Sequence, residues 1–449
     1  MTRILHRSSR SAPPVAASAQ GSWITEAGGR RLLDACGGAA VSCLGHGHPR
    51  VVEAIRRQAG QLDYVHSGAF SNAAAEELAE VLVGHEPGGL AGAYFVSSGS
   101  EAMEAALKLA RQYFLERGQD QRQHFIARRQ SYHGNTLGAL AVGGNAQRRA
   151  PYAPLLAEAF SHVSPAYAYR GQQAGESEAA YAARLAAELE AEFQRLGPDT
   201  VAAFIAEPVV GATLGCAPAP AGYFRAVRDV CDRHGALLIL DEVMCGMGRT
   251  GTLHAWEQEG IAPDIQTIAK GLGGGFQPIG GLLIASPILD AIRDGSGSFK
   301  HGHTYVAHPI ACAAALEVQH VIREEGLLPR VQALGERLRQ GLEARLGQHP
   351  HVGDIRGRGL FQAIELVANR DGKTCFDPGL QVNLLIRDAA LAAGVLCYPG
   401  GGTADGLHGD HALLAPPYTA TEEEIDIIVD AMGQAVDRVT STLRREARA

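Results

Sequence analysis

The stretch Ala236-Leu237-Leu238-Ile239-Leu240-Asp241-Glu242-Val243 places five apolar residues in a row directly before two carboxylates. A short, uninterrupted apolar run of this kind is typical of a strand that is buried on both faces. Burying an ionised carboxylate at the end of such a strand costs several kcal/mol unless a cation or a hydrogen-bonded partner meets it. We therefore expect Asp241 to have a cationic partner.

Two further apolar runs end in residues that can carry chemistry. Residues 201–206 lead into Glu207, and residues 263–269 lead into Lys270 and a glycine-rich turn. Burial lowers the pKa of a lysine and makes it a nucleophilic amine. Taken singly, each residue is more often a cap, a turn residue or a solvated charge. Because ligands bind outside the carboxyl ends of strands in open α/β sheets, the three together predict one catalytic site.

Composition excludes several other kinds of protein. The chain has 449 residues, 46% of them hydrophobic and 20% charged, which is typical of a soluble globular protein of two or three domains. A net charge of −8 gives no electrostatic reason to bind nucleic acid or an anionic membrane, and no apolar run has the length of a membrane span.

The cysteines and histidines indicate neither a disulfide framework nor a metal site. Eight scattered cysteines without a C-x-x-C pair are typical of reduced thiols in the cytoplasm, which is the compartment that we predict. The pairs His46/His48 and His301/His303 have no acidic or thiol ligand at the usual spacing, so we expect no metal site.

A second type of site is indicated where residues 93–96, a predicted strand, enter Ser97-Ser98-Gly99-Ser100-Glu101 and then a helix. Ser98 and Glu101 fit a capping box. The backbone N–H groups and positive dipole end of such a helix favour an anion, and Ser100 adds a hydroxyl; a well-capped helix without a ligand is the alternative. Farther along, Tyr132 or His133 either stacks on a planar ligand or simply packs in the turn.

We predict four segments, with the smaller domain built from both ends of the chain. They are a flexible start (residues 1–20, with Arg3, Arg7 and Arg10), the N-terminal part of the small domain (21–65), a large domain (66–324) and the C-terminal part of the small domain (325–449). Within them we expect a hairpin over 22–34, an exposed helix over 172–197, helices near 73–83, 310–321 and 331–346, a turn into a strand over 354–366, and a glycine-rich loop over 398–410.

In this order, the motifs resemble those of class III pyridoxal-phosphate-dependent aminotransferases of fold type I, the group that includes ω-amino-acid and amine transaminases. The resemblance implies an α/β fold with a mostly parallel seven-stranded sheet in the large domain. The matching segments are 98–102 (SGSEA), 131–134 (SYHG), 207–209 (EPV), 241–243 (DEV), 246–251 (GMGRTG), 269–271 (AKG), 303–305 (HTY), 356–360 (RGRGL) and 415–417 (APP).

The resemblance also implies roles for individual residues around a pyridoxal 5'-phosphate cofactor. Lys270 would form the Schiff base and later shuttle the proton, and Asp241 would pair with the pyridine nitrogen. The remaining cofactor residues would be Val243 and Tyr132 on the two ring faces, Gly99 and Ser100 at the phosphate, Thr304 reaching the phosphate of a neighbouring subunit, and His133, Glu207 and Met244. Thr304 implies a homodimer with shared sites and leaves open whether dimers pair into tetramers.

Substrate recognition departs from the family pattern. Asn135 and Gly406 stand where relatives carry an arginine that binds a substrate carboxylate. Arg356 remains, and we expect it either to switch between Glu207 and a carboxylate or to hold Glu207 in a permanent ion pair. Trp23, Tyr64 and Phe70 are candidates for an aromatic pocket wall, although aromatic residues are more often part of the core.

These observations predict a homodimeric aminotransferase. It would move an amino group from an ω-amino acid or a primary amine to a keto acid such as pyruvate or 2-oxoglutarate with ping-pong kinetics. The alternatives are an enzyme of the same fold with another reaction (aminomutase, decarboxylase or racemase), a non-catalytic cofactor-binding regulator, or a nucleotide-binding protein, for which no phosphate-loop motif is present.

Overall fold

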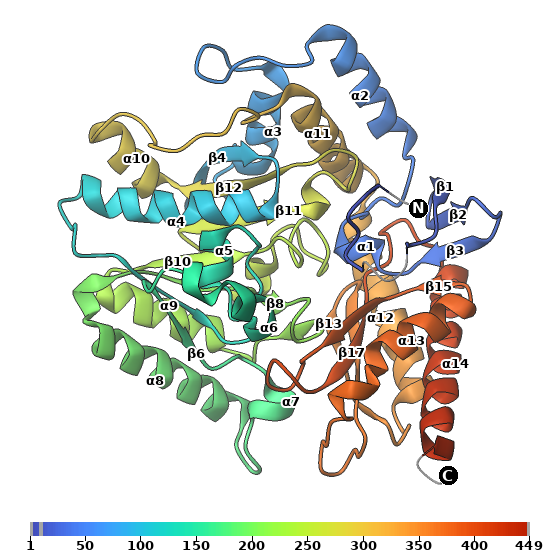
Figure 1. Ribbon diagram of the computed structural model, residues 1–449. Helices are drawn as coiled ribbons and strands as arrows, with labels where there is room; N and C mark the ends of the chain where they lie inside the picture. Colours follow the sequence, from blue (N-terminus) through green and yellow to red (C-terminus); the bar gives the residue numbers. More distant parts are fainter. Residues whose placement is uncertain (1–2, 9–11, 447–449) are drawn as a thin grey trace.

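The computed structural model describes residues 3–8 and 12–446 and is built around one large mixed sheet (Figure 1). The sheet has seven strands in the order β4-β12-β11-β10-β7-β5-β6, and only β12 runs antiparallel to its neighbours. The strands are β4 (Leu90–Val96), β5 (His124–Arg128), β6 (Phe160–Val163), β7 (Val201–Ala206), β10 (Leu237–Asp241), β11 (Ile265–Ala269) and β12 (Gly280–Ala285). The predicted mostly parallel, seven-stranded α/β sheet is confirmed.

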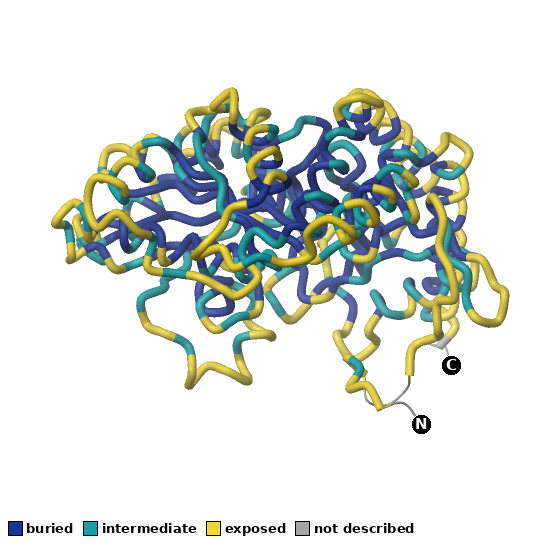
Figure 2. Tube along the Cα trace, turned by 90° about the horizontal axis from the view of Figure 1, so that it is seen from above, coloured by how far each residue is buried: buried dark blue, intermediate teal, exposed yellow. Residues whose placement is uncertain are grey.

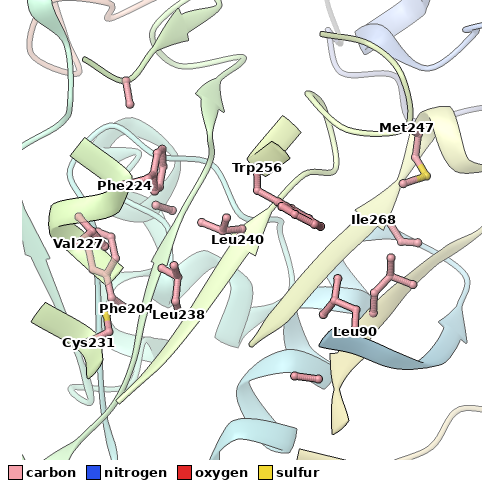
Figure 3. Close-up of a cluster of buried hydrophobic side chains, with 14 of the residues drawn as sticks. Leu90, Phe204, Phe224, Val227, Cys231, Leu238, Leu240, Met247, Trp256 and Ile268 are labelled. Atoms are coloured by element: carbon pink, nitrogen blue, oxygen red, sulfur yellow. The ribbon is translucent and has the colours of Figure 1, made fainter. Parts of the chain in front are cut away.

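Helices cover both faces of this sheet, which explains the unbroken apolar runs. Every residue of β7, β10, β11 and β12 is buried. On one face the core includes side chains from α3, α8, α9 and α11, and on the other it includes side chains from α4, α5 and α10. Figure 3 shows Phe204 and Leu238 of the sheet beside Val227 and Cys231 of α9. Figure 2 shows the buried strands inside a shell of exposed loops and helix surfaces.

The rest of the chain forms two four-stranded sheets and their helices. The sheet β13-β14-β17-β16 is antiparallel, and the sheet β1-β2-β3-β15 joins the N-terminal strands to a strand from the C-terminal part. Their strands are β1 (Ala16–Gln20), β2 (Trp23–Glu26), β3 (Arg31–Asp34), β13 (Val352–Arg358), β14 (Phe361–Leu366), β15 (Val395–Leu396), β16 (Tyr398–Gly401) and β17 (Asp410–Leu414); β8 (Val209–Val210) and β9 (Ala217–Pro218) form a small ribbon.

The described α-helices range from one turn to twenty-five residues. They are α1 (Gly37–Ala40), α2 (Pro49–Gln61), α3 (Ala73–Val83), α4 (Gly99–Glu116), α5 (Leu137–Val142), α6 (Ala146–Arg149), α7 (Ala168–Gly171), α8 (Glu178–Leu196), α9 (Tyr223–His234), α10 (Ser286–Asp294), α11 (Pro309–Glu324), α12 (Leu327–Leu346), α13 (Val382–Ala392) and α14 (Glu422–Glu446). None of the helices in the described ranges has both the length and the apolar composition needed to cross a bilayer.

Three expectations about local structure need correction. Residues 16–20, expected within a flexible start, form β1 and pair with β2, while Arg10 lies outside the described residues. Residues 354–366 belong to a hairpin of two strands, β13 and β14, rather than to a turn before one strand. The expected loop over 398–410 begins with a strand, β16, because its backbone pairs with β17.

Glycine at position 400 allows that unexpected strand to form. A Cβ atom at Gly400 would lie 2.1 Å from the ring of the buried His411 on β17. The hairpin over 22–34 and the helix near 73–83 are confirmed as β2–β3 and α3. The domain boundaries at residues 65 and 324 stay predictions.

Candidate active site

The carboxyl ends of three neighbouring strands meet at one cavity of about 450 Å³. β10 lies between β7 and β11, so Glu207, Asp241 and Lys270 come together although they are far apart in the sequence. The cavity is also lined by the predicted cofactor residues Gly99, Ser100, Tyr132, His133, Val243 and Met244. The structure thus gathers most of the predicted site at the strand ends, where ligands of open α/β sheets bind.

Lys270 is held in an unusual backbone conformation. Its φ of 44° lies in the left-handed region, which residues other than glycine seldom adopt and which is often found at functional sites. The chain turns there from β11 into one turn of 3-10 helix, and the carbonyl of Lys270 accepts the N–H of Gly274 at 2.8 Å. The turn therefore fixes the position from which the lysine side chain enters the cavity.

The surroundings of Lys270 make its amine less basic. Burial lowers the pKa of the Lys270 ammonium to about 8, while the carboxylates of Asp241 and Glu207 act in the opposite direction. The residue is only half-buried, because its side chain lines an open cavity. A lysine with a pKa near 8 has an appreciable neutral fraction at neutral pH, as a nucleophile or a proton acceptor requires.

Asp241 is fixed by two hydrogen bonds before any ligand binds. Its Oδ2 atom lies 2.7 Å from Nδ1 of His133, and its Oδ1 atom accepts the N–H of Val243 at 3.0 Å. Both the aspartate and the histidine are buried. Within the protein, His133 is the partner that we expected Asp241 to have. Among the described residues, Nε2 of this histidine has no hydrogen-bond partner.

Glu207 is held by backbone groups and not by Arg356. Its carboxylate accepts the N–H of Tyr132 at 3.1 Å and the N–H of Gly211 at 3.0 Å. Burial raises the pKa of Glu207, and the nearby Asp241 raises it further. The predicted Glu207–Arg356 ion pair is therefore wrong for this conformation.

Arg356 instead belongs to a separate buried cluster. Its Nη1 atom lies 2.7 Å from Glu365 and 2.9 Å from Asp354, and its Nε atom donates to the carbonyl of Gly215 at 2.8 Å. Arg170 also pairs with Glu365, at 2.7 Å. Glu365 lies on β14, across the hairpin from Arg356 on β13, and supplies the counter-charge in place of Glu207.

The start of α4 forms a cradle suited to an anion. The Ser98 side chain accepts the N–H of Glu101 at 3.2 Å, and the Glu101 carboxylate accepts the N–H of Ser97 at 2.7 Å. In a standard capping box the glutamate would accept the N–H of the cap residue, Ser98. Here it accepts the N–H of Ser97, one residue earlier. A Cβ atom at Gly99 would lie 2.9 Å from Val243, so only glycine fits between the helix start and that valine. Gly99 and Ser100, the first residues of α4, line the cavity, and the N–H groups at a helix start favour an anion.

Besides Arg356, four predicted residues lie outside the cavity that this chain forms. Trp23 donates its indole N–H to Glu424 at 2.7 Å. Tyr64 donates its hydroxyl to the carbonyl of Thr304 at 3.2 Å, and Thr304 itself is exposed. Phe70 is 67% exposed. Their predicted roles in a pocket wall or in a neighbouring subunit stay predictions.

Sequence reasoning missed several residues that line the cavity, among them Arg7, Ala39, Arg148 and Asn383. Arg148 lies on α6, and its guanidinium carbon is 5.0 Å from the centre of the Tyr132 ring. A run of two arginines after Asn145, with no acidic residue within eight positions on either side, is the signal in the sequence that could have drawn attention to α6.

Comparison with known proteins agrees with this geometry. The family model described as "Aminotransferase class-III" matches residues 4–436. An uncharacterized aminotransferase of Schizosaccharomyces pombe is 49% identical over 431 residues, which are 96% of this chain and 94% of that protein. The ω-transaminase of Pseudomonas jessenii in complex with PMP has a TM-score of 0.92 at 32% identity and matches over 98% of this chain and 97% of its own.

A thermostable (S)-enantioselective ω-transaminase from Thermomicrobium roseum is similar as well, with a TM-score of 0.91 at 34% identity, over 98% of this chain and 96% of its own. The fold is therefore the type I fold of pyridoxal-phosphate-dependent transferases, with a lysine and two carboxylates at the strand ends. The chain belongs to the class III aminotransferase family.

Proposed function

We propose that this enzyme uses pyridoxal 5'-phosphate to move an amino group from an ω-amino acid or a primary amine to a keto acid such as pyruvate or 2-oxoglutarate. One observation carries the proposal: Lys270, with its pKa lowered to about 8, lines the same cavity as the buried carboxylates of Asp241 and Glu207. The name of the Pseudomonas jessenii structure, a complex with PMP, supports the choice of cofactor.

The residues present fit this cofactor, as the cradle at α4 and the fixed carboxylate of Asp241 indicate. Gly99 and Ser100 would hold the phosphate, and Asp241 would pair with the ring nitrogen. Val243 and Tyr132 would cover the ring faces, while the other lining residues His133, Glu207 and Met244 would complete the site. When bound, pyridoxal phosphate supplies an electron sink for negative charge at the carbon beside the amino group.

The protein's own part in the reaction is proton transfer and positioning. The neutral Nζ of Lys270 would take the proton from that carbon and return it one position away. His133 would keep the Asp241 carboxylate in the orientation that its 2.7 Å contact fixes. Both substrates would use the same lysine and the same cavity in turn, with the amino group kept on the bound cofactor between them. The first product would therefore leave before the second substrate binds, and we expect ping-pong kinetics.

We further propose a cytoplasmic homodimer with shared active sites. Thr304, Tyr64 and Phe70 support this proposal because they are exposed in the single chain and outside its cavity, where a second subunit could use them. Thr304 would then reach the cofactor phosphate of the partner subunit. All eight cysteines, which lie in the described part of the chain, are free thiols, and this fits a reducing compartment.

The test is a half-reaction followed by visible absorbance. Purified enzyme loaded with pyridoxal phosphate is mixed with β-alanine, γ-aminobutyrate or a simple arylalkyl amine and no acceptor. We expect the absorbance near ~420 nm to fall with a donor and to return when pyruvate or 2-oxoglutarate is added. Absorbance that no donor changes, or products of decarboxylation or racemisation in place of a carbonyl compound, would contradict an aminotransferase acting on these substrates.

A further inference from the structure

We propose that Arg148 and Arg7, at the cavity that holds Lys270, bind a carboxylate of the substrate that is distant from its reacting nitrogen. Both arginines line that cavity, and nothing in the predicted cofactor site uses them. The proposal rests on the proposed function, because it specifies which donors the same site prefers: amino acids whose amine and carboxylate are separated by several carbons.

The distribution of charge in the cavity supports this assignment. The acidic lining residues, Glu207 and Asp241, are buried and already accept hydrogen bonds from the protein. Arg7 and Arg148 are exposed, and within the described residues neither has a carboxylate partner at ion-pair distance. In the interior of the cavity, the two carboxylates already have hydrogen-bond partners. At its solvent side, the two guanidinium groups have no carboxylate partner, and a substrate carboxylate would enter there.

Arg148 is positioned by its own helix and by an aromatic ring. The Asn145 side chain accepts the backbone N–H of Arg148 at 3.1 Å and so fixes the start of α6. The guanidinium lies over Tyr132, 5.0 Å from the ring centre, and the N–H of Tyr132 is bound by Glu207. An exposed contact between a cation and a ring is weaker than a charge-assisted bidentate hydrogen bond, so Arg148 can leave the ring for a carboxylate at a net gain.

Other candidate groups for a substrate carboxylate are committed elsewhere or carry no charge. Arg356 is held by Asp354 and Glu365. Arg149, next to Arg148, donates to the carbonyl of Gly143 at 3.0 Å and is not among the cavity residues. Asn145, Gln147 and Asn383 line the cavity and can add neutral hydrogen bonds without repelling an anion.

The experiment compares donors that differ only in the carboxylate. γ-Aminobutyrate and propylamine present the same three-carbon amine with and without a carboxylate, and each is titrated into the loaded enzyme without acceptor. The variants are Arg148→Gln, Arg148→Lys, Arg7→Gln and the double glutamine variant. Arg225→Gln removes an exposed arginine of α9 that is outside the cavity and serves as the matched control.

We expect Arg148→Gln to raise the half-saturating γ-aminobutyrate concentration about tenfold to a hundredfold, the usual effect of losing a charge-assisted hydrogen bond. Propylamine should change less than about twofold by the same reasoning. Arg7→Gln should act in the same direction, Arg148→Lys should restore part of the affinity, and Arg225→Gln should behave as wild type. Calorimetric binding of glutarate, which cannot react, should weaken in parallel and gives a readout that does not depend on turnover.

Two results would overturn the proposal. One is a γ-aminobutyrate titration and a glutarate affinity that do not change in the double variant. The other is an equal rise in the half-saturating concentrations of γ-aminobutyrate and propylamine, which would show that Arg148 only supports the shape of the cavity. If the wild-type enzyme reacts with neither amine, the proposed function fails, and the glutarate titration still decides whether Arg148 and Arg7 bind a carboxylate.

Discussion

Nδ1 of His133 lies 2.7 Å from Oδ2 of Asp241 inside the protein, and the other aspartate oxygen accepts the N–H of Val243. Two bonds from different elements thus determine the direction of one carboxylate in advance. Preorganisation of this kind lets a buried charge meet a ligand without rearrangement at the moment of binding. His133 then acts through Asp241 as a positioning residue.

Replacing His133 tests that relationship. We expect His133→Leu to lower kcat about tenfold to a hundredfold, because a hydrogen bond to a buried carboxylate is lost, while KM for the donor changes little. His133→Gln, which can still donate to Asp241, should recover part of the rate. Steady-state kinetics with one donor and one acceptor measure both. A His133→Leu enzyme with wild-type kcat would show that Val243 alone orients Asp241.

Replacing Lys270 should stabilise the protein in the absence of cofactor. Burial lowers the pKa of Lys270 to about 8, so at pH 7 the folded state carries a disfavoured charge. Lys270→Met removes this charge at similar length, and we expect the free energy of unfolding to rise by roughly 1–3 kcal/mol at pH 7. Denaturant unfolding of both proteins without pyridoxal phosphate measures the difference.

The pH dependence of that difference has a defined sign. Between pH 8 and the ordinary lysine value of 10.5, the unfolded wild-type chain binds a proton that the folded chain has lost. The stability of the wild type therefore rises with pH in this window, whereas Lys270→Met lacks this contribution. The advantage of the variant should be complete below pH 8 and shrink toward pH 10.5. An advantage that stays constant across this range would contradict the lowered pKa.

Gly99 and Val243 should be energetically coupled. A Cβ atom at Gly99 would lie 2.9 Å from Val243, so we expect Gly99→Ala to destabilise the protein by about 1–3 kcal/mol through overpacking. Val243→Ala removes the atoms in contact, and the double variant should be more stable than the sum of the single effects predicts. Thermal or denaturant unfolding of the four proteins gives the coupling. Additive effects would place the strain of Gly99→Ala elsewhere.

Arg356 should matter for stability and not for carboxylate recognition. Arg356→Met leaves Glu365 buried with only Arg170 as a cationic partner, and we expect the free energy of unfolding to fall by about 3 kcal/mol. KM for γ-aminobutyrate should stay within about threefold of wild type, since we expect the substitution to weaken folding and not substrate binding. Arg345→Met, which breaks an exposed pair with Asp437, is the control and should cost at most about 1 kcal/mol. A large rise in KM at unchanged stability would restore the switch hypothesis.

The strand ends were predictable and the partner of Arg356 was not. Uninterrupted apolar runs before Glu207, Asp241 and Lys270 identify buried parallel strands, and parallel strands bring their ends together whatever lies between them in the sequence. Glu365 meets Arg356 only through the register of β13 and β14, which pairs Asp354 with Glu365. No local pattern fixes that register.

The unexpected strands and cavity residues have a similar explanation. β1 (AASAQ) and β16 (YPGG) lack the β-branched residues that favour strands, and they form because a neighbouring strand offers hydrogen bonds. Arg7 and Arg148 reach the cavity from an irregular N-terminal segment and a four-residue helix. The position of such segments depends on tertiary packing, which periodicity in the sequence does not encode.

Lys270 is the residue that we propose to carry the cofactor, and the composition of the chain makes this directly testable. The sequence contains only four lysines, Lys108, Lys270, Lys300 and Lys373. The protein is incubated with pyridoxal phosphate, reduced with borohydride, digested and analysed by mass spectrometry. We predict a modification of one equivalent on Lys270 and an unmodified, colourless Lys270→Ala protein. Modification on Lys108, Lys300 or Lys373 in place of Lys270, or none at all, would contradict the claim.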